Sequence, residues 1–438
     1  MTTTDSLPAR RNLTLPEWGL VVLLALINFT HILDFVIVMP LGERLMDELH
    51  ITPGQFAHIV SAYGIAAAVA GVIAATLVDR FDRKPVLLIA YAGFIASTVV
   101  CGLVLDPAVT TSLLPTAEDG GVNPVYVGLL VARALAGAFG GVAASLIMTV
   151  IGDTFPDHRR GKAIGAVQSA FAVASVIGLP AGLLLAKWFG RAMPFYAIVS
   201  LSVVIFAVAL IRLPKVRKHL TGPRTDPVAQ FIAAVSNRGH WRSFAFTLLL
   251  VLGTFTIIPF LAPYMQANCG RTDTDIPIIY AAAGVITLVG MNLVGWLADR
   301  FGKRPVFLAL AVCSMGMTVV VTNLPDVGLV GVILACTGFM LTAAGRVVPA
   351  QAMMLWGADP KLRGAFTNLN SAVSHLATGI APMISGAIIT RADPHAPLVG
   401  YDTAGWVAVG FAAVALGISF LLKQPARPAA PTHEPTPA

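Results

Sequence analysis

Charged residues are scarce in this sequence. Only 12% of the 438 residues are Asp, Glu, Lys or Arg, whereas 56% are hydrophobic. A soluble domain carries roughly 25% charged residues, so this chain cannot cover a water-facing surface. It is predicted to be a multi-span membrane protein. Its net charge of +7 then indicates membrane topology rather than nucleic-acid binding, and no nucleic-acid partner is expected.

Motifs for common enzyme chemistry are also lacking. The four cysteines show no metal-ligand spacing and no disulfide framework, so no metal site is expected. There is no Gly-x-x-x-x-Gly-Lys-[Ser/Thr] phosphate loop, no nucleophile elbow and no His-Glu-x-x-His pair. These absences argue against an ATP-driven pump and against a membrane-embedded enzyme or receptor. No cofactor is expected.

Long apolar runs are abundant instead. A helix needs about 20 mostly apolar residues to cross the hydrocarbon, and this rule predicts twelve spans. They are 18–40, 56–78, 86–105, 125–151, 164–186, 194–212, 244–267, 278–298, 305–322, 327–355, 366–390 and 403–422. With the N-terminus inside, 22 basic residues lie in inner segments and five in outer loops. This bias predicts that both termini lie in the cytoplasm. The chain is expected to lie in the cell (inner) membrane.

A basic loop recurs at half the chain length. Asp79-Arg80-Phe81-Asp82-Arg83-Lys84-Pro85 returns 220 residues later as Asp299-Arg300-Phe301-Gly302-Lys303-Arg304-Pro305. The recurrence predicts an all-α membrane protein of two pseudo-symmetric six-helix bundles. The predicted parts are a tail (1–17), a bundle (18–212), a central loop (213–243), a second bundle (244–422) and a disordered tail (423–438). Apolar spacing in the central loop, at Val228, Phe231, Ile232 and Val235, predicts a short amphipathic helix.

One acidic residue, Asp34, falls well inside a span. A carboxylate in the bilayer costs about 2.5–3.5 kcal/mol on insertion scales, so such a residue usually faces a protein interior and has a function. Arg133 in the fourth span lies at a matching depth and is its predicted partner. His31 shares the Asp34 helix face and is a candidate for tuning or relaying a proton. The alternative is a permanent structural ion pair beside a packing histidine.

Other polar residues inside spans are candidates for lining a cavity. They are Asn28, Tyr63, Gln168, Tyr280, Asn292, Arg346 and His375. Arg346 either binds an anionic group, pairs with a helix end or snorkels toward the membrane surface. Aligning the basic loops that follow the fourth and tenth spans gives an offset of 203, which places Cys336, not Arg346, opposite Arg133.

Two further groups are predicted to serve movement. The inner loops, through Asp79, Arg80, Arg83, Asp299, Arg300 and Arg304, are expected to form a cytoplasmic gate or, alternatively, only to anchor the chain by positive charge. In the fifth span, Gly178, Pro180 and Gly182 predict a kink at the interface of the bundles, because proline deletes a backbone hydrogen bond.

These motifs resemble the major facilitator superfamily over about residues 18–422. Gly295 to Arg304 is similar to the signature loop of that family, whereas the first copy has Ala75 and Asp82 in place of two glycines. Arg133 with Gly137 and Gly141 resembles the fourth-helix motif of proton-coupled members, and the whole resembles the twelve-span drug:proton antiporter, or arabinose-efflux-like, branch. The resemblance implies a central cavity and rocker-switch alternating access.

The sequence therefore favours a monomeric, proton-coupled exporter of small amphipathic or drug-like molecules. In this hypothesis Asp34 carries the proton, Arg133 tunes its proton affinity, and substrate competes for the site. A proton-independent facilitator, a sugar or metabolite exporter, a lysolipid flippase and an organic-anion carrier that uses Arg133 or Arg346 are the alternatives.

Overall fold

A computed structural model describes residues 13–77, 81–113, 123–214, 227–359, 362–393, 396–422 and 424. Twelve helices of these segments are long and apolar enough to cross a membrane, which confirms the predicted number of spans. Their ends lie within six residues of the predicted ones; the largest difference is at the seventh span, which begins at Arg238. The extra turn there is capped by the Asn237 side chain, which accepts a hydrogen bond from the Gly239 amide.

The first six spans form one half of the molecule. Its elements are α1 (Leu15–Ile37), α2 (Gly42–Leu49), α3 (Pro53–Leu77), α4 (Arg83–Leu105), α5 (Pro107–Leu113), α6 (Pro124–Thr154), α7 (Asp157–Val173), a π-helical turn (Ala174–Gly178), α8 (Leu179–Phe189) and α9 (Met193–Arg212).

The second half follows the central segment. Its elements are α10 (Pro227–Ser236), α11 (Arg238–Phe255), α12 (Ile258–Ala267), α13 (Asp275–Phe301), α14 (Lys303–Thr322), α15 (Gly328–Gly345), α16 (Val347–Met354), a 3₁₀ turn (Leu355–Gly357), α17 (Arg363–Ile388) and α18 (Tyr401–Leu421). Thr390 and Val399 form a β-bridge in the loop before α18.

Prolines explain where the first span ends and where three other spans are interrupted. Proline has no amide hydrogen and its ring collides with the carbonyl four residues earlier. Four residues before such a proline, the helix ends or changes its winding in each case. The α1 helix ends one residue after Val36, α11 ends at Phe255 and α15 ends at Gly345, and Val176 lies in the π-helical turn. The responsible residues are Pro40, Pro259, Pro349 and Pro180.

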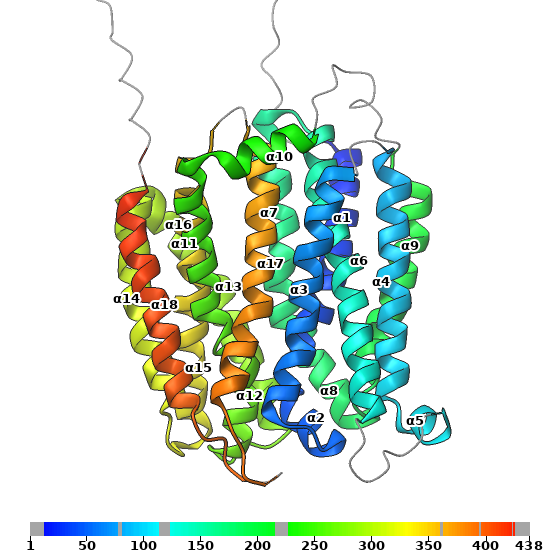
Figure 1. The fold of residues 1–438 in the computed structure, drawn as a ribbon, viewed down its shortest axis with the longest axis vertical. Helices are drawn as coiled ribbons and strands as arrows, with labels where there is room; N and C mark the ends of the chain where they lie inside the picture. Colours follow the sequence, from blue (N-terminus) through cyan, green and yellow to red (C-terminus); the bar gives the residue numbers. More distant parts are fainter. Residues whose placement is uncertain are drawn as a thin grey trace, which may run out of the picture.

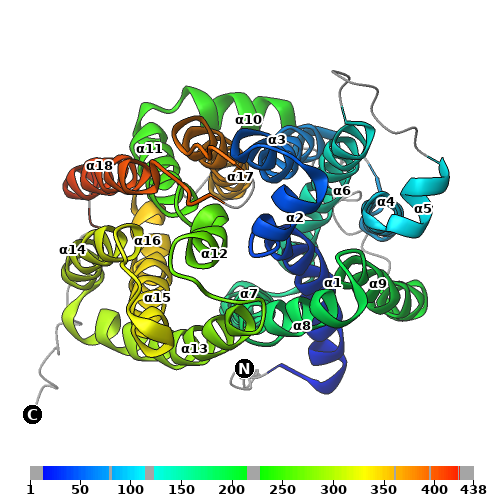
Figure 2. The ribbon, with the colours of Figure 1, turned by 90° about the horizontal axis from the view of Figure 1, so that it is seen from below.

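The bundle has two distinguishable ends. Helix α10 lies across one end, where it packs on α3 and α17, and we call this end the α10 face (Figure 1). A helix is thereby found in the predicted central loop, but Val228 and Ile232 of its predicted apolar face are exposed and Ala234 is buried instead. At the opposite end, the α2 face, α2 packs against α12 of the other half (Figure 2). The predictions for residues 1–12, 215–226 and the end of the chain from 425 lie outside the described residues.

The longest contact between the halves runs along α3 and α17. A Cβ atom added to Gly64 would lie 2.6 Å from the amide nitrogen of Gly379, and one added to Gly386 would lie 2.3 Å from the Cβ of Ala57. These glycines let the two backbones approach closely, as is common for membrane helices. The two six-helix halves are therefore held together by α3 and α17, by α13 against α8 and the π-helical turn, and by α2 and α12 at one end.

Candidate functional site

Asp34 and Arg133 form an ion pair in the interior of the first half. The Nη1 atom of Arg133 lies 2.7 Å from Oδ2 of Asp34, and neither side chain has exposed surface. The predicted pairing of α1 with α6 is thereby confirmed. The arginine also donates to two backbone carbonyls, those of Asp34 (2.9 Å) and Phe35 (3.4 Å). The guanidinium is thus held by α1 independently of the carboxylate charge.

Small residues on α6 allow this contact. A Cβ atom on Gly137 would lie 2.2 Å from the carbonyl oxygen of Tyr63, and one on Gly141 would lie 2.6 Å from that of Ala67. Because α6 is pressed against α3 in this way, the Arg133 guanidinium lies 4.6 Å above the Tyr63 ring. The stacking adds a cation–π contact to the ion pair.

A chain of hydrogen bonds runs beside the pair from α3 through α1 to α7. The Tyr63 hydroxyl lies 3.2 Å from the His31 carbonyl oxygen and 3.3 Å from His31 Nδ1. His31 Nε2 lies 3.0 Å from Asn28 Oδ1, and the Asn28 amide donates to the Val167 carbonyl. Since an amide oxygen only accepts, a neutral His31 carries its proton on Nε2. His375 is a half-buried residue of α17.

An aromatic contact connects this site to the second half. The ring of Phe35, next to Asp34, lies 5.1 Å from the Tyr63 ring and 5.8 Å from the Phe255 ring on α11. Phe35 and Phe255 are both half-buried. The offset between them is 220 residues, the same as between the two basic loops, so the contact joins equivalent positions of the two halves.

Arg346 is the buried cation of the second half. It lies at the break between α15 and α16, and 2% of its surface is exposed. Its Nη2 donates to the Thr254 hydroxyl (2.8 Å) and, at 3.5 Å, to the Leu250 carbonyl, both on α11. Its Nε has no hydrogen-bond partner. Arg346 has no acidic partner among the ion pairs of the described segments.

The remaining candidates are dispersed. Tyr280 is buried and its hydroxyl has no hydrogen-bond partner, whereas Gln168 and Asn292 are exposed. Asn292 donates to the Leu288 carbonyl of its own helix. The structure thus brings Asn28 and Tyr63 to the Asp34 site and leaves Gln168 and Asn292 apart from it.

The predicted gate loops make contacts inside their own halves. Asp79 and Arg80 lie outside the described residues. Arg83 is buried and pairs with Asp153 at 3.1 Å, and Asp299 pairs with Lys303. Arg300 stacks on Trp296 and Phe301. Arg304 donates to the Leu422 carbonyl and stacks on Trp356. At this end no ion pair between described residues joins the halves, and a gating role stays a prediction.

The predicted kink of the fifth span coincides with the π-helical turn at 174–178. A Cβ atom on Gly178 would lie 2.8 Å from Leu33 and one on Gly182 would lie 2.6 Å from Ile37, so both glycines face α1. On the other side, a Cβ atom on Gly284 of α13 would lie 3.1 Å from the Val176 backbone. The turn, which ends two residues before Pro180, therefore lies between its own bundle and the other half.

Charged residues on the α2 face join the two halves, and sequence reasoning did not identify them. Arg391, in the loop after α17, pairs with Glu43 and Asp47 of α2. Lys187, in the last turn of α8, donates to the Thr274 hydroxyl at 2.8 Å. The signal was present in the sequence, because both cations are among the five basic residues predicted to lie outside. We call Arg391, Glu43 and Asp47 the α2-face latch.

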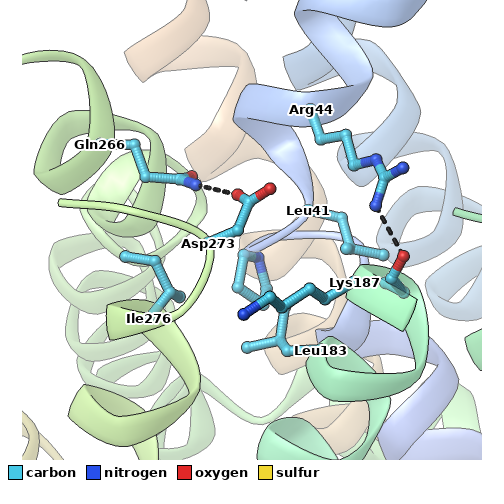
Figure 3. A pocket seen from close by; sticks show the side chains of 9 residues that line it. Leu41, Arg44, Leu183, Lys187, Gln266, Asp273 and Ile276 are labelled. Atoms are coloured by element: carbon cyan, nitrogen blue, oxygen red, sulfur yellow. Dashed lines mark hydrogen bonds between the residues drawn. The ribbon is translucent and has the colours of Figure 1, made fainter. Parts of the chain in front are cut away.

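A small pocket of about 20 Å³ lies beside the latch at the seam of the halves (Figure 3). Its lining comes from both halves: Pro40, Leu41, Arg44, Leu183, Ala186, Lys187, Gln266, Asp273 and Ile276. The side chain of Arg44 donates to the Ala186 carbonyl, and Gln266 donates to Asp273. A pocket of this size has room for about one water molecule. A second pocket at the same seam, of about 300 Å³, is lined by Glu43, Arg44, Asp47, Glu48, Lys187 and Asp273.

The comparisons with known proteins follow this architecture. The profile of the Major Facilitator Superfamily matches residues 24–354 and 243–438. The MFS-type transporter YceJ of Bacillus subtilis (strain 168) is 22% identical over 370 residues, which are 84% of this chain and 88% of YceJ. Multidrug resistance protein 2 of the same organism is 23% identical over 408 residues, 90% of this chain and 93% of that protein.

Solved structures share the fold. A D-xylose–proton symporter superposes with a TM-score of 0.70 at 15% identity, over 92% of this chain and 97% of the symporter. A bacterial homologue of the human lysosomal transporter Spinster, in an inward-facing and unoccupied conformation, has a TM-score of 0.68 at 15% identity, over 94% and 98% of the two chains.

Proposed function

The chain belongs to the major facilitator superfamily, and on that premise we propose that this transporter is a proton-coupled exporter of small amphipathic molecules. The observation that carries the proposal is the Asp34–Arg133 pair, which is fully buried in the first half. The relatives that are efflux and multidrug resistance proteins support the direction of transport.

Asp34 is the proposed proton carrier. In the ionised state, its carboxylate balances the charge of Arg133 inside the bilayer. When a proton binds, the carboxyl becomes neutral, but Arg133 keeps its bonds to the carbonyl oxygens of Asp34 and Phe35. Asp34 therefore has two charge states that the same backbone arrangement accommodates. Since the carboxyl has no exposed surface in this state, proton exchange requires the halves to move.

The α10 face is the proposed cytoplasmic side of the cell membrane, because the predicted inner segments hold most of the basic residues. The state described here is then closed toward the outside by α2, α12 and the latch. Opening to the outside requires the latch to break. Asp34 lies on α1, and α1 leads directly into α2, which carries two latch residues.

The test uses everted membrane vesicles and a compound identified in a growth screen of an efflux-deficient host. We expect Asp34→Asn to fold, since asparagine still accepts a hydrogen bond from Arg133, and to lose at least tenfold of the uptake driven by a pH gradient. The matched control is Asp326→Asn, which removes the carboxylate from a 2.8 Å pair with Arg271 on the exposed rim. Wild-type gradient-driven uptake by Asp34→Asn overturns the proposal.

A further inference from the structure

The buried arginine at the break of the tenth span, Arg346, has no acidic partner among the described residues. Arg346 is as deeply buried as a core residue, yet its described partners are a hydroxyl and a distant carbonyl oxygen. A guanidinium stays protonated at neutral pH, so it cannot relieve this cost by losing a proton. A buried charge without a counter-ion costs several kcal/mol even after relaxation. Such a group is expected where an anion binds for part of the working cycle.

The first half shows what is missing. In the first half, Arg133 of the fourth span pairs with Asp34 of the first span. In the second half, Arg346 of the tenth span donates to Thr254 of the seventh span, and these two spans correspond to the fourth and the first. Thr254 follows Asp34 by 220 residues, the offset of the basic loops and of Phe35 and Phe255. The arginines themselves are out of register, as the loop alignment predicts, but their contacts are equivalent. A threonine occupies the place of the counter-ion.

We propose that Arg346 binds the carboxylate of a singly charged, amphipathic substrate, a refinement that rests on the exporter function proposed above. One positive charge matches one negative charge, and the planar guanidinium matches a planar carboxylate. The Nε donor is free, and the bond from Nη2 to the Leu250 carbonyl is long enough at 3.5 Å to be exchanged for an anion oxygen. Thr254 keeps the guanidinium oriented.

The apolar part of the substrate has a neighbouring surface. Thr254 is followed directly by Phe255, whose ring meets Phe35 between the halves. Both rings are half-buried, so part of their surface is open. This aromatic contact is the candidate surface for the apolar part of the molecule, because Phe255 follows Thr254 on α11. The proton and the anion therefore occupy separate sites that share one contact.

The first test needs no substrate. Thr254→Asp supplies the missing carboxylate, and Thr254→Asn is its uncharged match of the same size. Because the aspartate can pair with Arg346, we expect the purified full-length Asp variant to melt at a higher temperature than the Asn variant. If the Asp variant melts at the same or a lower temperature, Arg346 is already neutralised and the proposal fails.

The second test measures binding to the detergent-purified protein by thermal stabilisation. The probes are octanoate, 4-phenylbutyrate and 2-naphthoate, each beside its uncharged primary amide. We expect at least one acid to stabilise the wild type at concentrations at least tenfold lower than its amide, and Arg346→Gln and Thr254→Asp to abolish that preference. Arg346→Lys keeps the charge without the fork and should retain part of it. Equal effects of every acid and amide overturn the proposal.

The two proposals fail in different ways. Binding in detergent needs no proton gradient, so an Arg346-dependent preference for acids stands even if Asp34→Asn transports normally. Conversely, gradient-driven export that depends on Asp34 but ignores Arg346→Gln supports the exporter function and overturns the anion site.

Discussion

The α2-face latch makes a prediction about which conformation the transporter prefers. Arg391→Gln removes the cation that holds α2 of the first half against the α17–α18 loop of the second. The side chain of Arg391 is 5% exposed, and its partners Glu43 and Asp47 are 14% and 30% exposed. Without the arginine, the closed state keeps two carboxylates that have lost their shared counter-ion, whereas the open state exposes both to water.

The magnitude follows from this burial. Removing one partner of a fully buried pair costs about 3–5 kcal/mol, and an exposed pair contributes about 0–1 kcal/mol. A latch of intermediate exposure should contribute about 2–3 kcal/mol to the closed state. At about 1.4 kcal/mol per tenfold change, its loss shifts the equilibrium toward the outward-open state by about 30- to 150-fold. If the outward-open state makes up about 1% of the wild-type molecules, it would make up about a quarter to a half or more of the Arg391→Gln molecules.

The assay is a distance measurement across the seam. Spin labels at Thr52 of the first half and Val399 of the second, in a Cys313→Ser background, report the opening by pulsed electron resonance. We expect Arg391→Gln to add a population at longer distances. Arg271→Gln is the control, because Arg271 pairs with Asp326 within the second half. An unchanged distance distribution for Arg391→Gln refutes the latch.

Two further predictions follow from local contacts. Gly137→Ala should lower the melting temperature by several degrees and reduce transport, because its Cβ would lie 2.2 Å from the Tyr63 carbonyl; Gly152→Ala on the same helix, with open space around its Cβ, should change neither quantity. Burial of Glu48 opposes ionisation, but the hydrogen bonds and charges of Arg44 and Arg191 hold the pKa of this carboxyl below its ordinary value. Its contribution is therefore present above about pH 4.5 and lost as the pH falls through the lowered pKa. Thermal melts at pH 7 and at decreasing pH should show a stability deficit of Glu48→Gln that shrinks with acidification; a constant deficit contradicts this account.

Much of the fold was predictable because the membrane imposes it. Backbone polar groups must be paired inside the bilayer, so each apolar run of sufficient length becomes a helix. The repeated basic loop gave the duplication, and the prolines mark where spans break. The position of α10 across α3 and α17 was not predictable, because the spacing at Val228 and Ile232 suggests an apolar face but does not say which helices it meets, and both side chains are exposed.

The candidate site was partly predictable for a similar reason. An acid and a base at matched depth in a medium that penalises both are expected to meet, as Asp34 and Arg133 do. Uncharged residues carry no such penalty, and the sequence could not decide which faces Gln168 and Asn292 occupy. The latch and the Lys187 contact could not be predicted, because the charge count places Arg391 and Lys187 outside but does not show that their partners come from the opposite half.

The equivalence of Asp34 and Thr254 bears on how transport is coupled. A proton and a substrate can drive one another only if both bias the same conformational equilibrium. Competition for a single carboxylate is one arrangement, but Phe35 and Phe255, next to Asp34 and Thr254, meet where the halves join. A charge change on either side of this contact alters the same interface, so a proton at Asp34 and an anion at Arg346 need not touch. By linkage, the anion must then change the proton affinity of Asp34 by the same factor as the proton changes the anion affinity. Separate sites that obey this reciprocity distinguish the arrangement from direct competition, in which protonation at Asp34 would exclude the substrate outright.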